Sequence, residues 1–168
     1  MNHSFELESN KIILKPMSST DSENYRVLRN RKDNISFFFS GTEITKDQQA
    51  NWYNEYLADE TQYMFSIYET DSAMYIGGIG IYDVDNSNGC AEVGRIIVDR
   101  ELAAGKHYGA EAIRLLEVLA KEELGLKLLY ANIYSTNVPS LKSFYGAGFV
   151  KDCEKEGITK VIYDIGEK

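Results

Sequence analysis

The sequence predicts a mixed α/β fold in a single domain that spans residues 1–168. Two observations support this prediction. Runs of β-branched and aromatic residues alternate with amphipathic stretches along the chain, and a strand–helix–strand unit lies near its centre. That unit consists of an expected strand at 91–98, a helix at 108–124 and a strand at 128–134. No repeat or low-complexity linker divides the chain, and its length suffices for one substantial core.

Before this unit, turn and cap residues separate the elements. Thr45 and Gln48, three residues apart, form a capping-box pattern that starts a helix carrying Trp52 and Tyr53. The segment 30–41 is expected to be irregular, and it contains Phe37, Phe38 and Phe39. These five aromatic residues are either core or one wall of a cleft, and core is our expectation for most of them. The other elements expected here are a helix at 23–29 and strands at 11–15, 64–68 and 74–82.

The central helix has the clearest periodicity. One face of this helix contains Ile113, Leu116, Ala120 and Leu124, and Gly125 is expected to end the helix. After the strand at 128–134, Pro139 marks the start of another helix. A last strand is expected at 159–164. The pattern therefore predicts a sheet flanked by helices.

Two glycines, Gly105 and Gly109, lie four residues apart between the strand that ends at Val98 and the central helix. Glycine lets the backbone approach a ligand closely because it has no Cβ. The N–H groups of a first helical turn lack intrahelical acceptors, and the helix dipole adds positive charge there. This glycine loop, residues 104–109, therefore predicts a phosphate-binding site. A nicotinamide-dinucleotide domain is excluded, because the loop does not follow the first strand and lacks the Gly-x-Gly-x-x-Gly spacing.

Composition excludes several classes of partner. The formal net charge is −8, and no Lys/Arg cluster offers a footprint for nucleic acid. Cys90 and Cys153 lack metal-ligand spacing, and His3 and His107 are the only histidines, so no metal site is expected. Neither a signal-peptide pattern nor an apolar run of membrane-spanning length is present. We expect a cytoplasmic protein without a nucleic-acid or membrane partner.

A second motif comprises Asn137–Ser140 and Phe144–Phe149. Together with the glycine loop it resembles the GNAT superfamily of acetyl-CoA-dependent N-acetyltransferases, whose second motif reads Asn-x-x-Ser/Ala, an aromatic on the following helix, then Gly-Phe. The resemblance covers roughly residues 10–163. The family loop reads Arg/Gln-x-x-Gly-x-Gly/Ala, and the chain departs from it with Ala104 at the first position and His107 at the middle glycine. The connection after Val98 is also one residue longer than is common.

The resemblance implies a mostly antiparallel sheet, flanked by helices and splayed open between the strands that end near Val98 and Tyr134. Acetyl-CoA would lie in the split, with its pyrophosphate on the glycine loop and its pantetheine along the first strand, and with no metal. A backbone N–H near Ile97 would stabilise the oxyanion. The residues implied to contact the cofactor are Ile96, Ile97, Val98, Ala104, Gly105, Lys106, His107, Tyr108, Gly109, Asn137, Ser140 and Phe144.

Acyl transfer to an amine needs a base, because amines are mostly protonated at pH 7. Glu92 is the candidate base; the alternative is that it is the solvent-facing half of an alternating strand. The family's general acid falls on Phe144, which cannot donate a proton. Tyr145, about 100° further around the helix, is the candidate replacement, with packing as the alternative. Candidate acceptor contacts are Arg29, Tyr82 and Tyr134, and a solvated charge is the alternative for Arg29.

These features lead to the hypothesis of an N-acetyltransferase acting on a primary amine by direct attack on the thioester. Four segments resemble the branch of ribosomal-protein alanine and nucleotide-amino-sugar N-acetyltransferases, namely Leu28–Asn30, Thr45–Trp52, Ile76–Gly80 and Ala91–Gly94. The acceptor is expected to be a small amine, a nucleotide-linked amino sugar or a protein N-terminus, and a homodimer is considered as the assembly. The alternative is a non-catalytic acyl-CoA-binding or sensing domain.

Overall fold

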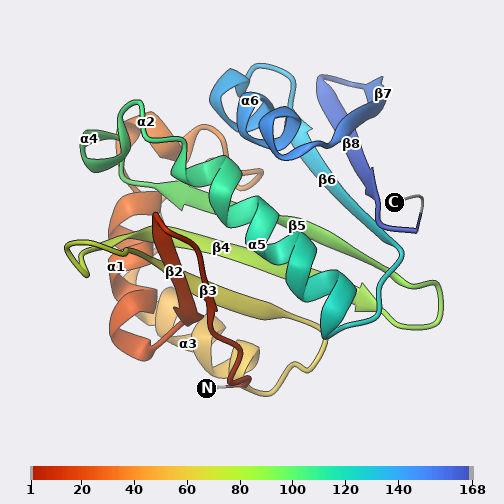
Figure 1. The fold of residues 1–168 in the computed structure, drawn as a ribbon. Helices are drawn as coiled ribbons and strands as arrows, with labels where there is room; N and C mark the ends of the chain where they lie inside the picture. The colour runs from red at the N-terminus through yellow and green to blue at the C-terminus, as the bar shows by residue number, and fades with distance from the viewer. Residues whose placement is uncertain (1, 167–168) are drawn as a thin grey trace.

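The computed structural model describes residues 2–166 and contains an eight-stranded sheet with helices on both faces (Figure 1). The strands lie in the order β1-β2-β3-β4-β5-β6-β8-β7. The pair β5–β6 is parallel and the other six pairs are antiparallel. The mixed α/β fold with a mostly antiparallel sheet is therefore confirmed. The strands are β1 (Leu7–Glu8), β2 (Ile12–Pro16), β3 (Tyr63–Glu69), β4 (Tyr75–Asp85), β5 (Cys90–Val98), β6 (Leu128–Tyr134), β7 (Val150–Lys155) and β8 (Ile158–Asp164).

The long helix α5 crosses one face of the sheet, and α1 and α3 cover the opposite face (Figure 1). Each of the last two begins at a side-chain cap. Ser18 accepts a hydrogen bond from the Asp21 N–H, and Thr45 and Gln48 form the expected capping box. The helices in the described part of the chain are α1 (Ser19–Arg29), α2 (Lys32–Ile35), α3 (Lys46–Leu57), α4 (Arg100–Ala103), α5 (Tyr108–Glu122) and α6 (Val138–Ala147).

Two apolar clusters hold these layers together. The larger lies between α5 and the sheet, where the periodic face predicted from the sequence buries Ile113, Leu116 and Ala120 completely. The smaller lies under α1 and α3 and includes Tyr56 and Ile97. Both clusters contact β5, so this strand is held from its two faces. Among residues 2–166, no helix combines the length and apolar character needed to cross a bilayer.

The sheet opens between β5 and β6. Their parallel register covers three pairs, from Cys90 opposite Leu128 to Glu92 opposite Tyr130. Beyond Glu92, β5 stays paired with β4, and β6 stays paired with β8 along its whole length. The two halves of the sheet therefore diverge past Glu92, and the splay that the family resemblance implied is confirmed.

A β-bulge lies in β5 just past this point. Gly80 pairs with Gly94 and Gly78 pairs with Ile97, so two residues of β5 face one residue of β4. Arg95, the first of these two residues, has a φ of 50°, which few residues other than glycine adopt. Tyr25 from α1 donates a hydrogen bond of 2.8 Å to its carbonyl oxygen. The bulge thus fixes where the backbone and side chain of Arg95 lie.

Four short or peripheral elements differ from the sequence prediction. The segment 30–41 contains α2, and the connection after Val98 contains α4. Strand β7 is missing from the prediction because all six of its residues are exposed, so it has no apolar alternation. Strand β1 has two residues and is formed by its pairing with β2. Helix α1 also begins earlier than expected, at Ser19, because Ser18 caps it.

Candidate active site

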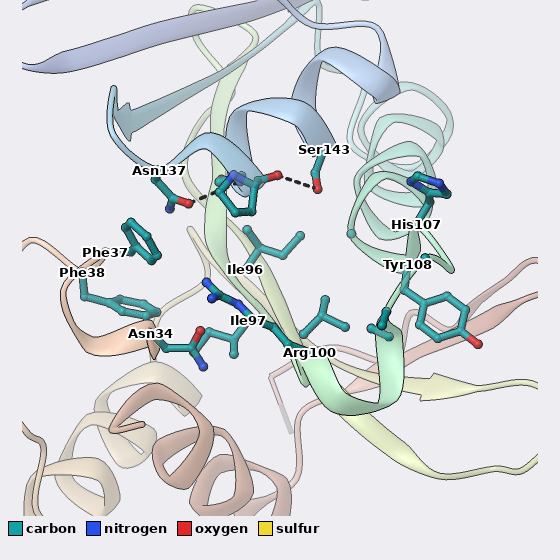
Figure 2. A pocket seen from close by; sticks show the side chains of 17 residues that line it. Asn34, Phe37, Phe38, Ile96, Ile97, Arg100, His107, Tyr108, Asn137 and Ser143 are labelled. Carbon is teal, nitrogen blue, oxygen red and sulfur yellow. Dashed lines mark hydrogen bonds between the residues drawn. The ribbon is translucent and has the colours of Figure 1, made fainter. Parts of the chain in front are cut away.

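A cavity of about 430 Å³ lies beside the N-terminus of α5, between the first turn of α6 and the end of β5 (Figure 2). Its lining includes every residue that was expected to contact the cofactor except Lys106 and Phe144. The opposite wall of the cavity is lined by Asn34, Phe37 and Arg100 (Figure 2). The structure thus brings together two sequence motifs that stand about thirty residues apart along the chain.

The glycine loop turns into α5 through two residues with positive φ. Gly105 has a φ of 74°, and His107, directly before the helix, has φ 59° and ψ 31°. Histidine tolerates this left-handed conformation better than most residues, so the loop makes its turn into α5 without a glycine at His107. Its side chain makes no capping hydrogen bond. The first-turn N–H groups of α5 lack intrahelical acceptors, and the cavity beside them fits a phosphate-bearing ligand.

Gly109 has a packing function beside this cavity. A Cβ at this position would lie 2.8 Å from Ser143 Oγ and 3.4 Å from Ser143 Cβ. Glycine therefore permits the close approach of α5 to α6. Asn137 supports the same junction, because its side chain accepts a hydrogen bond of 3.3 Å from the Ser140 N–H and caps α6.

The side chain of Lys106 is occupied outside the cavity. Its Nζ donates a hydrogen bond of 2.6 Å to Glu69 Oε1 at the end of β3. Tyr108 donates to the same oxygen, and Ser72 donates to Oε2 at 2.5 Å. These donors, with Lys106 first, lower the pKa of Glu69 to about 2. Glu69 therefore ties the glycine loop to the turn between β3 and β4, a contact that the sequence analysis missed.

A second cavity, of about 350 Å³, adjoins the first where β5 and β6 diverge. It contains Glu92, Tyr82 and Tyr134, three of the residues expected to act on the acceptor. Arg95 and Asn132, which the sequence analysis did not single out, also line it. The two cavities share a wall formed by Phe37, Phe38, Ile96, Asn137 and Ser140.

Glu92 lies at the apex of the splay. Its carboxylate accepts hydrogen bonds of 3.3 Å from both the backbone N–H and the side-chain amide of Asn132, the second β6 residue past the last paired position. Burial raises the pKa of Glu92 above its ordinary value, and the hydrogen bonds from Asn132 partly oppose that rise. A half-buried carboxylate with a raised pKa is suited to accept a proton near neutral pH.

Aromatic side chains close one wall of the second cavity. The cavity is lined by Phe37, Phe38 and Phe39. Phe38 also packs against the smaller core cluster, so the expectation of core needs correction only for Phe37 and Phe39. Phe39 packs edge-on against Tyr134, with ring centroids 4.9 Å apart, and so bridges the two sides of the splay. Trp52 and Tyr53 pack against the smaller core cluster, as expected.

Besides Lys106, two candidate residues lie outside both cavities. The Arg29 guanidinium donates to the Thr42 carbonyl at 2.9 Å and to Ser40 Oγ, so it holds the Ser40–Thr42 segment in place. Tyr145 is 43% exposed and lines neither cavity. Phe144 is buried, packs against Phe149 and lines the second cavity. Helix α6 thus presents Phe144 to the splay, and Tyr145 lies toward solvent.

A sheet that parts at a half-buried carboxylate, beside a helix N-terminus open to phosphate, has the architecture of the acyl-CoA N-acyltransferases. The family model of the acetyltransferase (GNAT) domain matches residues 11–150. The chain therefore belongs to the GNAT acetyltransferase family and is an N-acetyltransferase, which confirms the resemblance drawn from its motifs. Within residues 2–166, no group of three or more His, Cys, Asp or Glu side chains is arranged to hold a metal ion.

Solved structures share the fold at low sequence identity. Spermidine N-acetyltransferase from Vibrio cholerae, in complex with CoA and spermine, is 17% identical with a TM-score of 0.83, over 95% of this chain and 98% of that one. FdhC, a nucleotide-linked sugar GNAT protein, is 21% identical with a TM-score of 0.82, over 96% and 91%. A GNAT-family acetyltransferase from Bacillus anthracis is 14% identical with a TM-score of 0.80, over 97% and 100%. A sequence search among curated proteins finds no significant match.

Proposed function

We propose that the protein transfers an acetyl group from acetyl-CoA to the primary amine of a small molecule, by direct attack of the amine on the thioester. The observation that carries this proposal is the pair of adjoining cavities, one reaching the glycine loop and the other reaching Glu92. Their shared wall lies where donor and acceptor would meet. A volume of about 350 Å³ suits a small molecule, and the contacting rings of Phe39 and Tyr134 both line the cavity.

The donor side is built mainly from backbone groups. The first-turn N–H groups of α5 would bind the pyrophosphate, and β5 from Ile96 to Val98 would bind the pantetheine through its unpaired edge. When bound, acetyl-CoA supplies the acetyl group as a thioester. The bulge at Arg95 leaves a β5 residue out of the ladder with β4, so a backbone N–H near Ile97 is proposed to stabilise developing negative charge.

On the acceptor side, Glu92 is proposed as the base that takes the proton from the ammonium, directly or through a water molecule. The amine then has a free electron pair for attack on the carbonyl carbon. Tyr82 and Tyr134 would flank the acceptor. The leaving thiolate needs little general-acid assistance, because the pKa of a thiol is near 8.5 and solvent can protonate the thiolate after it leaves. The position of Tyr145 favours solvent over this side chain as the proton source.

The test combines binding with turnover. Calorimetry should detect CoA binding, and thiol release from acetyl-CoA should depend on added amine in a panel of an amino sugar, an amino acid, spermidine and a short peptide. Binding of CoA without amine-dependent thiol release would instead support the non-catalytic acyl-CoA-binding domain. The homodimer considered above stays a prediction, which analytical ultracentrifugation checks.

A further inference from the structure

We propose that Arg95 binds an anionic group of the acceptor, so that the acceptor class is a molecule carrying a primary amine and, a few bonds away, a carboxylate or phosphate. This inference rests on the proposed function, and it names the chemistry that the second cavity selects. Three features of Arg95 support it, namely its fixed position, its unpaired charge and its neighbour Glu92.

The guanidinium of Arg95 is held in place by aromatic rings. It lies over the ring of Tyr82, 4.1 Å from the centroid, and 5.9 Å from the ring centroid of Trp52. Its backbone is fixed by the bulge and by the hydrogen bond from Tyr25. Stacking on an aromatic face orients the planar group while leaving its edge available for hydrogen bonds. Arg95 thus presents a preorganised cation to the cavity that it lines.

Arg95 forms no ion pair with a carboxylate within residues 2–166, and its charge only contributes to lowering the pKa of Asp59. Its one hydrogen bond to an oxygen runs to the neutral amide of Gln62, at 2.6 Å. Four other arginines form ion pairs with carboxylates, namely Arg26, Arg31, Arg100 and Arg114. A guanidinium has five N–H donors, so Arg95 keeps several for a ligand. A carboxylate or phosphate can accept two of these N–H hydrogen bonds at once as a bidentate acceptor, and neutral groups do so less well.

Glu92 and Arg95 lie in the same cavity with Tyr82 between them. Tyr82 pairs with Glu92 in the β4–β5 register, and its ring stacks under Arg95. Gly94 makes this possible, because a Cβ there would lie 2.4 Å from the Tyr82 hydroxyl. A molecule with an ammonium at Glu92 therefore meets, in the same cavity, the cation that stacks on Tyr82. An acidic group on the acceptor complements this arrangement, whereas the second ammonium of a polyamine is repelled by it.

The experiment compares kcat/KM within matched pairs of amines. One pair is 4-aminobutyrate and its neutral amide, and the other is glucosamine 6-phosphate and glucosamine; the pairs distinguish carboxylate from phosphate. Spermidine supplies the polycationic case. In the parent protein, we expect the acidic member of at least one pair to be preferred by about tenfold or more. In Arg95→Gln that ratio should fall to near one, and Arg95→Lys should keep part of it.

Arg114→Gln is the matched control. It removes the same charge from the surface of α5, outside both cavities, and should keep the parent's preference. CoA affinity by calorimetry shows whether each variant is folded. A parent protein that prefers the neutral amines or spermidine overturns the inference without any variant, as does an unchanged ratio in folded Arg95→Gln. If no amine in the panel elicits thiol release, the proposed function itself fails, which is a different outcome.

Discussion

The ammonium of Lys106 lies 2.6 Å from a carboxylate oxygen of Glu69, a residue 37 positions earlier in the chain. This contact draws the one lysine of the glycine loop away from the cavity. In the proposed function, the pyrophosphate would then be bound by backbone N–H groups, whose positions depend on how well the loop is held. Because its donors lower the pKa of Glu69 to about 2, the carboxylate is ionised at any pH suitable for an assay.

The first prediction is that Glu69→Gln raises KM for acetyl-CoA by roughly threefold to tenfold and leaves kcat nearly unchanged, because the loop loses a charged anchor rather than a reacting group. Lys106→Ala should raise KM by less than about fivefold, as expected for an exposed ion pair. Steady-state kinetics at saturating amine measures both. Glu122→Gln, on the exposed far end of α5, is the control. A fall in kcat with unchanged KM would contradict the anchoring role.

The second prediction concerns the junction of α5 and α6. Gly109→Ala places a methyl group 2.8 Å from Ser143 Oγ, so it should lower the melting temperature by roughly 2–8 °C and weaken CoA binding. Adding Ser143→Ala removes the clashing oxygen and should restore much of both properties. Ser143→Ala alone should change little. If the double variant is no better than Gly109→Ala, the clash with Ser143 is not the cause.

The third prediction is a pH profile. Glu92 must be ionised to act as base, and its pKa is raised, so kcat should fall with decreasing pH at a higher pH than for an ordinary glutamate. Glu92→Gln should lose most activity near pH 7 and less at high pH, where the amine is already neutral. The charge of Asp83 contributes to the raised pKa, so Asp83→Asn should move the acid limb to lower pH. An equal loss at every pH in Glu92→Gln would point to acceptor positioning instead.

The fourth prediction is that Tyr145→Phe keeps kcat within about threefold of the parent, since the side chain is 43% exposed and lines neither cavity. A general acid typically contributes about 10²- to 10⁴-fold, so the two interpretations are easily separated. Turnover at saturating acetyl-CoA and amine, with CoA affinity alongside, makes the comparison. A hundredfold loss of kcat with intact binding would restore the acid role to Tyr145.

Local patterns in the sequence predicted the elements that are determined by interactions between residues close together in the chain. The Thr45–Gln48 capping box, the apolar face of α5 and the strand Leu128–Tyr134 were all expected, because periodicity and caps report on neighbouring residues. Most residues expected on the cofactor side line one cavity for the same reason, since a glycine loop before a helix is a continuous segment; their contact with the cofactor stays a prediction.

The second cavity was less accessible to sequence reasoning because long-range contacts create it. Arg95 owes its orientation to a bulge between β4 and β5 and to rings from Tyr82 and Trp52, and no pattern around residue 95 encodes these. The helical phase of α6 decides that Phe144, and not Tyr145, faces the splay. Arg29 looked available in the sequence, yet the folded chain uses it to hold the Ser40–Thr42 segment.

Past Glu92, β5 has a strand partner on one side only. An unpaired strand edge therefore lies inside the cleft and not at the outer edge of the sheet. Free edges recruit foreign strands and promote aggregation. A cofactor whose amide groups pair along Ile96–Val98 would shield this edge, and a ligand that binds only the folded state also raises stability in proportion to the logarithm of its concentration. The shelf life of the purified protein should therefore depend on whether CoA is kept in the storage buffer.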